Sequence, residues 1–148
     1  MNSKQLETIL KSARVTKNKF IGVFPSDKIP KNKKFPHCMV INTTKEGTRG
    51  EHWVACYVPS SRTIEYFDSL GEHPNLDISA YLSTFRNVKI NKFKIQFPTA
   101  DTCGHFCIYF LVSRCSGIPY CQVMDTLFRT RAIADWLVKG FVRTMMRV

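Results

Sequence analysis

The sequence predicts an α+β fold in which a central, mostly antiparallel sheet is flanked by helices. Helical patterns occupy both ends of the chain, short apolar segments lie between them, and a tight turn joins two of these segments. The chain has 148 residues, and we expect a single domain over 1–148. Its hydrophobic content of 44% is typical of a globular protein rather than of a disordered one.

The first predicted element is a helix over 2–14, followed by a series of strands. Asn2 can cap the first turn of this helix, and Gln5 completes a capping box. The apolar residues of its buried face recur at helical spacing: Leu6, Ile9 and Leu10. Apolar or alternating segments then predict strands at 20–24, 37–42, 52–58, 62–68 and 88–96.

Polar loops and further helices connect these strands. A loop rich in proline and lysine covers 28–36, and a polar loop covers 43–50. Pro59-Ser60-Ser61 form the turn between the third and fourth strands. Apolar spacing predicts the remaining helices at 76–85, 103–114, 122–129 and 131–146.

Cys103 stands at the start of a predicted buried helix. The first turn of a helix presents unpaired N–H groups and the positive end of the helix dipole, and both favour a thiolate. Gly104 follows it and lacks a side chain, so a substrate could approach closely. This segment alone, however, is better explained by a core cysteine at a helix start.

His52 and Asp68 lie at the open end of the predicted hairpin. If 59–61 is a three-residue loop, Val58 pairs with Arg62, and His52 then faces Asp68 directly. An aspartate at that distance can orient the imidazole as a general base. The alternative is a surface pair of opposite charges across two strands. Glu65 and Asp101 are the other acids to consider.

Gln96 precedes Cys103 by seven residues. A loop of that length can fold back and place the Gln96 amide near the sulfur. With the backbone N–H of Cys103, the amide would form an oxyanion hole. A surface glutamine at a strand end is the simpler alternative. Taken together and in this order, the four residues favour a nucleophilic cysteine.

The segments EHWVACYV, IEYFDSLG and QFPTADTCGHFC resemble the adenovirus proteinase family (adenain), which shares a clan with the SUMO-type ubiquitin-like-protein proteases. The similarity extends upstream through FIGVF and PHCMVINT and covers about 1–115. The resemblance implies a cysteine endopeptidase with a papain-like active site, whose residues follow the order His, acid, Gln, Cys. The implied catalytic residues are His52, Asp68, Gln96 and Cys103. Trp53 would cover a narrow substrate cleft and favour glycine near the cut.

The chain also departs from that family. Adenovirus enzymes carry Glu where this chain has Asp68, and their hairpin is one residue longer. They join an activating viral peptide through a cysteine, whereas 81–95 contains none, which argues against a covalent peptide cofactor. No prosthetic group is implied. The chain resembles a compact relative from another DNA virus or a virus-like transposon.

The resemblance implies cleavage of viral capsid or core precursors at glycine-containing sites during virion maturation. The implied location is the virion and the host nucleus, and we expect a monomer. Removal of ubiquitin-like modifiers is the alternative activity.

A net charge of +11 predicts a polyanionic partner. The candidate contacts to DNA are Lys31, Lys33, Lys34, Arg143 and Arg147. No base-reading motif is present, so binding would be independent of sequence. DNA could activate the protease, as in the adenovirus family. A non-catalytic nucleic-acid-binding protein is the alternative from another class.

Neither a metal site nor a membrane span is predicted. Cys103, His105 and Cys107 do not converge on one helix, and no second cysteine pair stands at zinc-finger spacing. No apolar run reaches the roughly 18 residues of a membrane span. The six cysteines without a secretory signal indicate a reducing, intracellular environment.

Overall fold

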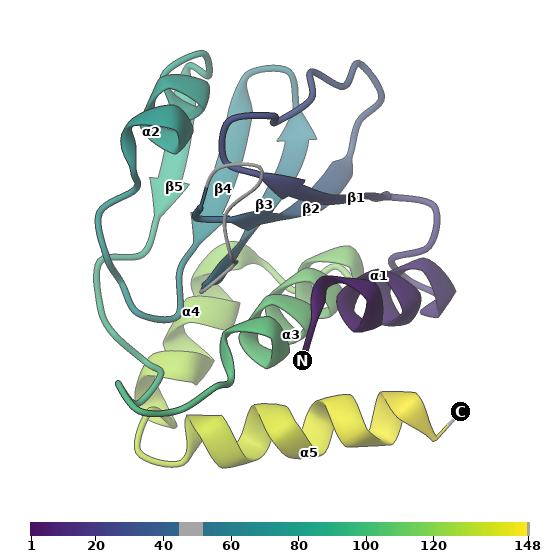
Figure 1. The fold of residues 1–148 in the computed structure, drawn as a ribbon, viewed down its shortest axis with the longest axis vertical. Coiled ribbons are helices and arrows are strands. Elements are labelled where there is room, and N and C mark those ends of the chain that lie inside the picture. Colours follow the sequence, from purple (N-terminus) through teal and green to yellow (C-terminus); the bar gives the residue numbers. More distant parts are fainter. Residues whose placement is uncertain (45–51, 148) are drawn as a thin grey trace.

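The apolar segments form a five-stranded sheet with helices on both faces (Figure 1). The computed structural model describes residues 1–44 and 52–147, so most of the predicted 43–50 loop lies outside the described residues. The strands, in spatial order, are β1 Phe20–Pro25, β2 His37–Asn42, β3 Trp53–Ser60, β4 Thr63–Phe67 and β5 Asn87–Ile90. The helices are α1 Ser3–Ser12, α2 Leu76–Leu82, α3 Cys103–Cys115, α4 Tyr120–Arg129 and α5 Ala134–Met146.

The sheet is mixed. β3 runs antiparallel to both β2 and β4, whereas the outer strands β1 and β5 run parallel to their neighbours. The predicted α+β class is therefore confirmed, but the antiparallel arrangement holds only for the three central strands. Parallel neighbours require the chain to return along the sheet before pairing again. The segment around α2 provides this return between β4 and β5.

The turn between β3 and β4 is tighter than the sequence predicts. Ser60 pairs with Thr63, and a bulge interrupts the ladder before this pair. Ala55 consequently faces Phe67, whereas a three-residue loop would have set it opposite Glu65. The predicted register was wrong by two residues. A shift of two leaves every side chain on its original face of the sheet.

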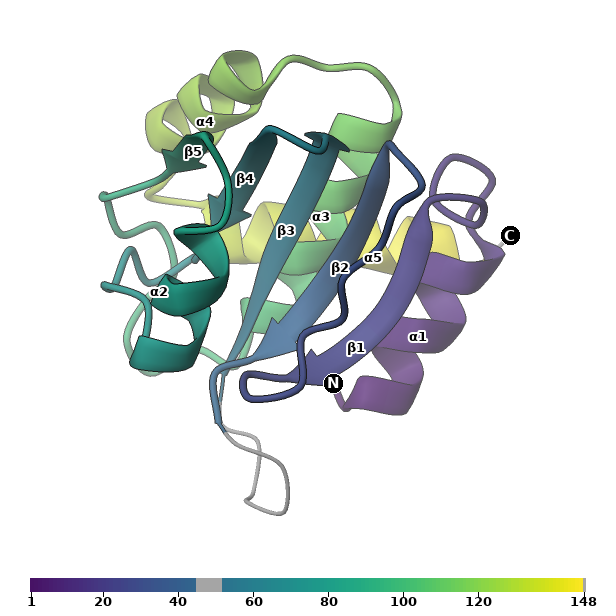
Figure 2. The ribbon, with the colours of Figure 1, turned by 90° about the horizontal axis from the view of Figure 1, so that it is seen from above.

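Each face of the sheet carries its own apolar core. Alternate residues of β2 contribute to opposite sides: Cys38 and Val40 to one core, Met39 and Ile41 to the other. The first core packs against α1, α3, α4 and α5, and the second is covered by α2 (Figure 2). Burial on both faces explains the uninterrupted apolar run of β2.

Helix α3 lies between the sheet and α5 (Figures 1 and 2). Its buried residues include Phe106, Ile108, Phe110 and Leu111, which point in several directions around the helix. Such a helix must be enclosed by other elements. The start of α3 at Cys103, as predicted, is therefore held within the body of the protein.

The chain leaves the sheet earlier than predicted on its way to α3. β5 ends at Ile90, so the expected strand over 88–96 was wrong in its second half. The backbone N–H groups of Ile95 and Gln96 instead both donate to the carbonyl of Ser69, each at 2.9 Å. The segment that follows β5 is thus fastened to the turn that follows β4.

A glycine makes this contact possible. Gly71 has a φ of +63°, and a Cβ atom there would lie 2.6 Å from the backbone of Phe93. Both the positive φ and the close approach exclude a larger side chain. The turn that contains Gly71 therefore packs the two segments together.

Candidate active site

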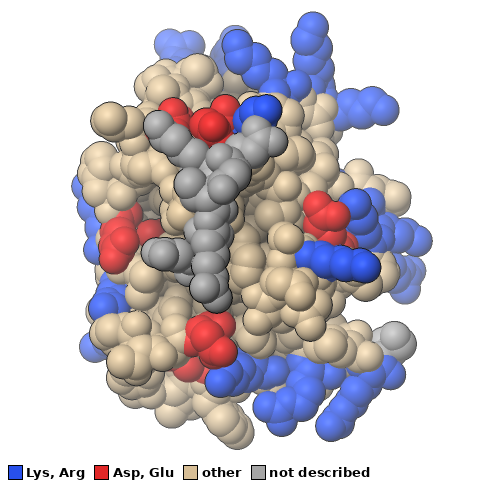
Figure 3. All heavy atoms as spheres, viewed as in Figure 1, with Lys and Arg blue, Asp and Glu red and all other residues tan. Residues whose placement is uncertain are grey.

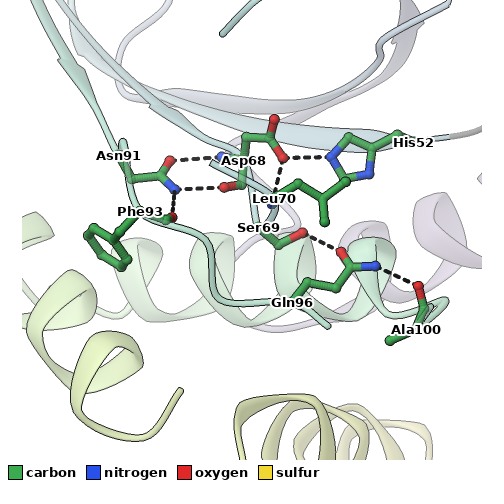
Figure 4. A network of polar contacts seen from close by, with 8 residues as sticks. All are labelled: His52, Asp68, Ser69, Leu70, Asn91, Phe93, Gln96 and Ala100. Carbon is green, nitrogen blue, oxygen red and sulfur yellow. Dashed lines mark hydrogen bonds and ion pairs between the residues drawn. The ribbon is translucent and has the colours of Figure 1, made fainter. Parts of the chain in front are cut away.

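The side chains of His52 and Asp68 meet just beyond the ends of β3 and β4. Nε2 of His52 lies 2.6 Å from Oδ1 of Asp68, and the two side chains are only 12% and 4% exposed (Figure 4). The observed register would set Asp68 opposite Val54, so the predicted direct pairing was wrong. His52 is instead a diagonal neighbour on the same face, which is still within reach of a long side chain.

Asp68 is held in place by an asparagine that the sequence interpretation missed. The Asn91 side chain accepts from the Asp68 N–H at 2.9 Å and donates to the Asp68 carbonyl at 2.6 Å. The amide therefore takes the place of a neighbouring strand. Oδ1 of Asp68 also accepts from the N–H of Leu70 at 2.9 Å. Asn91 directly follows β5, a strand whose residues are mostly exposed, so no apolar pattern in the sequence marked it.

Cys103 is the first residue of α3 and is only 6% exposed. Burial alone raises the pKa of its thiol. Hydrogen bonds from His52 and from the backbone N–H groups of Trp53 and Gly104 outweigh burial and lower the pKa below its ordinary value. The environment of Cys103 thus favours a thiolate.

The pKa of His52 moves in the opposite direction. Burial of the ring lowers it, but the hydrogen bond to Asp68 and the interaction with Cys103 together raise it to about 9. Because Nε2 is engaged by Asp68, Nδ1 is the nitrogen left for the thiol. A lowered pKa for Cys103 and a raised pKa for His52 together favour a thiolate–imidazolium pair.

Gln96 is buried with its amide orientation fixed. Oε1 accepts from the hydroxyl of Ser69 at 2.6 Å, and Nε2 donates to the carbonyl of Ala100 at 2.7 Å (Figure 4). The amide carries two N–H donors, and Ala100 takes one of them. Ser69, directly after Asp68, was not singled out in the sequence. Ser69 therefore links the turn that follows Asp68 to Gln96.

Trp53 and Gly104 contribute mainly through their backbones. Trp53 is half-buried, and its indole N–H has no hydrogen-bond partner among the described residues. A Cβ at Gly104 would lie 3.2 Å from Met1 and 3.4 Å from Leu6. The space beside Gly104 is therefore filled by the N-terminal segment and is not open to a substrate, which corrects the sequence interpretation of this glycine.

The five basic residues predicted to contact DNA are exposed, but they do not form one patch. Lys31, Lys33 and Lys34 lie in the loop between β1 and β2, at the end of the molecule opposite α5, where Arg143 and Arg147 stand (Figure 1). Lys and Arg side chains project from both ends of the face in Figure 3.

Within residues 1–44 and 52–147, no group of three or more His, Cys, Asp or Glu side chains could hold a metal ion. No helix in the same part of the chain is long and apolar enough to cross a bilayer.

A similar sequence and two similar folds accompany this geometry. The chain is 27% identical to the protease of Porcine adenovirus A serotype 3, over 72% of this chain and 63% of that protein. This chain therefore spans less than two thirds of the length of that relative. No protein-family model matches it.

The similar folds come from solved structures of low sequence identity. The crystal structure of the ASFV pS273R protease has a TM-score of 0.63 at 14% identity, covering 88% of this chain and 65% of that one. The central domain of the uncharacterized Lpg1148 protein from Legionella pneumophila has a TM-score of 0.52 at 18% identity. The match covers 99% of this chain and 97% of that one. The resemblance predicted from the sequence is thereby confirmed: the chain is similar in sequence to an adenovirus protease and shares its fold with a viral protease.

Proposed function

We propose that the chain is a cysteine endopeptidase with Cys103 as nucleophile and His52 as general base. The observation that carries the proposal is the buried contact of 2.6 Å between His52 and Asp68, with Cys103 at the start of α3. The pKa of Cys103 is lowered and that of His52 is raised, which supports the same roles. Homology to the adenovirus protease supports the same assignment.

In the proposed reaction, Sγ of Cys103 attacks the carbonyl carbon of the scissile peptide bond. Gln96 and the backbone N–H of Cys103 donate to the oxyanion that forms. His52 gives its proton to the leaving amine, and a thioester remains on Cys103. His52 then takes a proton from water, which attacks the thioester and releases the acid product. Asp68 keeps the imidazole oriented throughout.

For the substrate, we propose viral capsid or core precursors cut next to glycine during virion maturation, in the virion and the host nucleus. The half-buried Trp53 beside His52 supports a restricted cleft. A cavity of about 360 Å³, bordered by Gln96, Phe97 and Pro98, leaves space for part of a peptide beside Gln96. Removal of ubiquitin-like modifiers is the second possible activity. We propose that the enzyme is a monomer that needs no covalent peptide cofactor.

Two reagents test this proposal. Peptides with glycine near the cut should be cleaved, whereas an electrophile on a ubiquitin-like C-terminus should label Cys103 only if the isopeptidase activity is present. Cys103→Ala should be inert in both assays. Cys121→Ala is the matched control, because Cys121 is an exposed free thiol on α4. Equal cleavage by wild type and Cys103→Ala would refute the proposal.

We also propose that duplex DNA binds the basic surface without sequence preference and activates cleavage. The exposure of the five basic residues and the net charge of +11 support this. Fluorescence anisotropy should show affinity falling steeply with salt, with a log–log slope of about −0.9 for each phosphate neutralised.

Substitution of the two basic groups separately identifies the face that DNA contacts, because the groups lie at opposite ends of the molecule. Alanine at Lys31, Lys33 and Lys34 together is compared with alanine at Arg143 and Arg147. A nearly flat salt dependence would remove DNA as a partner. Binding without faster cleavage would remove it as an activator.

A further inference from the structure

The loop between Gln96 and Cys103 is fastened by one carboxylate from α5. Oδ2 of Asp135 accepts from the backbone N–H of Phe97 at 3.1 Å, and Oδ1 accepts from the hydroxyl of Thr102. Phe97 directly follows Gln96, and Thr102 directly precedes Cys103. A single side chain therefore holds both ends of the loop that joins the two proposed oxyanion donors.

The other hydrogen bonds of this loop do not provide the same support. The N–H of Ala100 donates to the carbonyl of Phe97 at 3.0 Å, and Nε2 of Gln96 donates to the carbonyl of Ala100. Both bonds are local, so they shape the loop without fixing it to the rest of the protein. Ser69 anchors the Gln96 side chain, and Asp135 anchors the backbone that follows it.

Helix α5 is a firm support for Asp135. Ala134, Val138 and Val142 on its inner face are buried in the core that also encloses α3. Asp135 lies in the first turn, where a negative charge is favoured by the helix dipole. The helix lies outside the segment that resembles the adenovirus enzymes, so the motifs gave no reason to connect it with the site.

We propose that Asp135 is a positioning residue that sets the distance between Gln96 and the Cys103 N–H in the oxyanion hole. The inference rests on the proposed cysteine protease activity. An oxyanion hole works only if its donors stand about 2.7–3.1 Å from the developing charge. Loss of Asp135 should therefore impair the chemical step and leave the reactivity of the thiolate unchanged.

The experiment compares two reactions of Cys103. Peptide cleavage and binding of a peptide aldehyde form a tetrahedral oxyanion or its hydroxyl analogue, whereas alkylation by iodoacetamide does not. In Asp135→Ala we expect kcat to fall by about 10- to 100-fold, because small misplacements of catalytic groups cost up to about 100-fold. KM and the alkylation rate should change less than about twofold. Aldehyde affinity should fall in parallel with kcat.

Three further variants separate positioning from general support. Asp135→Asn should recover most of kcat, since its oxygen can accept from Phe97 and its amide can donate to the Thr102 oxygen. Thr102→Val breaks one contact and should give an intermediate kcat, which keeps the test valid if Asp135→Ala does not fold. Asp101→Ala is the matched control in the same loop. Its side chain is 88% exposed and 3.9 Å from Lys139 of α5, so we expect no effect.

Two results would overturn the inference. One is an unchanged kcat in Asp135→Ala. If that variant is unfolded, an unchanged kcat in Thr102→Val has the same meaning. The other is an equal fall in kcat and in alkylation rate, which would mean that Asp135 supports the whole site. Failure of the proposed function itself looks different, because wild-type Cys103 would then neither cleave peptides nor bind the aldehyde.

Discussion

Asp68 and Glu65 are two buried carboxylates, one at the end of β4 and one within it, and each is paired with a cation. Glu65 receives two hydrogen bonds from Arg114 of α3, at 2.6 and 2.9 Å, and the guanidinium also lies over the ring of Tyr57. Asp68 receives a single bond from His52 at 2.6 Å. Both carboxylates have a nitrogen at 2.6 Å, but arginine and histidine differ in chemistry.

The arginine cannot give up its proton, so its pair with Glu65 can only hold β4 against α3. The histidine can lose and regain a proton, and its second nitrogen is left for a thiol whose pKa is lowered. The comparison shows that burial and a short ion pair do not identify a catalytic acid. The proposed catalytic role of Asp68 depends instead on a titratable partner next to the Cys103 thiol.

The largest effect should come from Asp68→Asn. The substituted amide keeps the shape of the side chain but no longer stabilises the imidazolium. We expect kcat/KM to fall by roughly 10²- to 10⁴-fold, the range typical of lost acid–base assistance. Urea denaturation should show a comparatively small change in the free energy of unfolding. Activity equal to wild type would reduce the His52–Asp68 pair to a structural contact.

Glu65→Gln should produce the opposite pattern. It leaves the Arg114 guanidinium largely buried without a counter-ion, and breaking such a pair costs about 3–5 kcal/mol of unfolding free energy. The folded fraction should keep the wild-type kcat. The double variant Glu65→Gln, Arg114→Met should regain part of the stability, because the uncompensated charge is gone. A large loss of kcat in the folded single variant would contradict a purely structural role for Glu65.

The pH dependence should distinguish the pairs as well. Cleavage by the wild type should decline above about pH 9, where His52 loses the proton needed by the leaving amine. In Asp68→Asn this alkaline limb should move to lower pH, because the bond to Asp68 is the main contribution that raises the His52 pKa. Glu65→Gln should leave the limb in place. An unmoved limb in Asp68→Asn would assign it to another group.

The smallest effect should come from Asp68→Glu. This change keeps the charge and supplies the acid found in the adenovirus enzymes. The extra methylene must fit where Nε2 and Oδ1 already lie 2.6 Å apart and Asn91 fixes the backbone. We expect kcat/KM about tenfold below wild type and well above Asp68→Asn. Activity no better than that of Asp68→Asn would show that the position of the carboxylate matters as much as its charge.

Much of the local structure could be predicted from short-range patterns. The capping box of α1, the whole of β2 and the start of α3 at Cys103 stand where periodicity and capping residues predict them. Such features depend on residues only a few positions apart. The catalytic roles of His52, Asp68, Gln96 and Cys103 remain a prediction, which the geometry supports.

The sequence by itself determined which groups could do chemistry, in which order, and which helices and strands would carry them. The tertiary structure decided how these groups are held. A bulge in the β3–β4 ladder set the register, and the anchors Asn91, Ser69 and Asp135 come from segments far apart in the chain. A single polar residue produces no periodic signal. Only the folded chain reveals that its hydrogen-bonding groups meet a distant backbone.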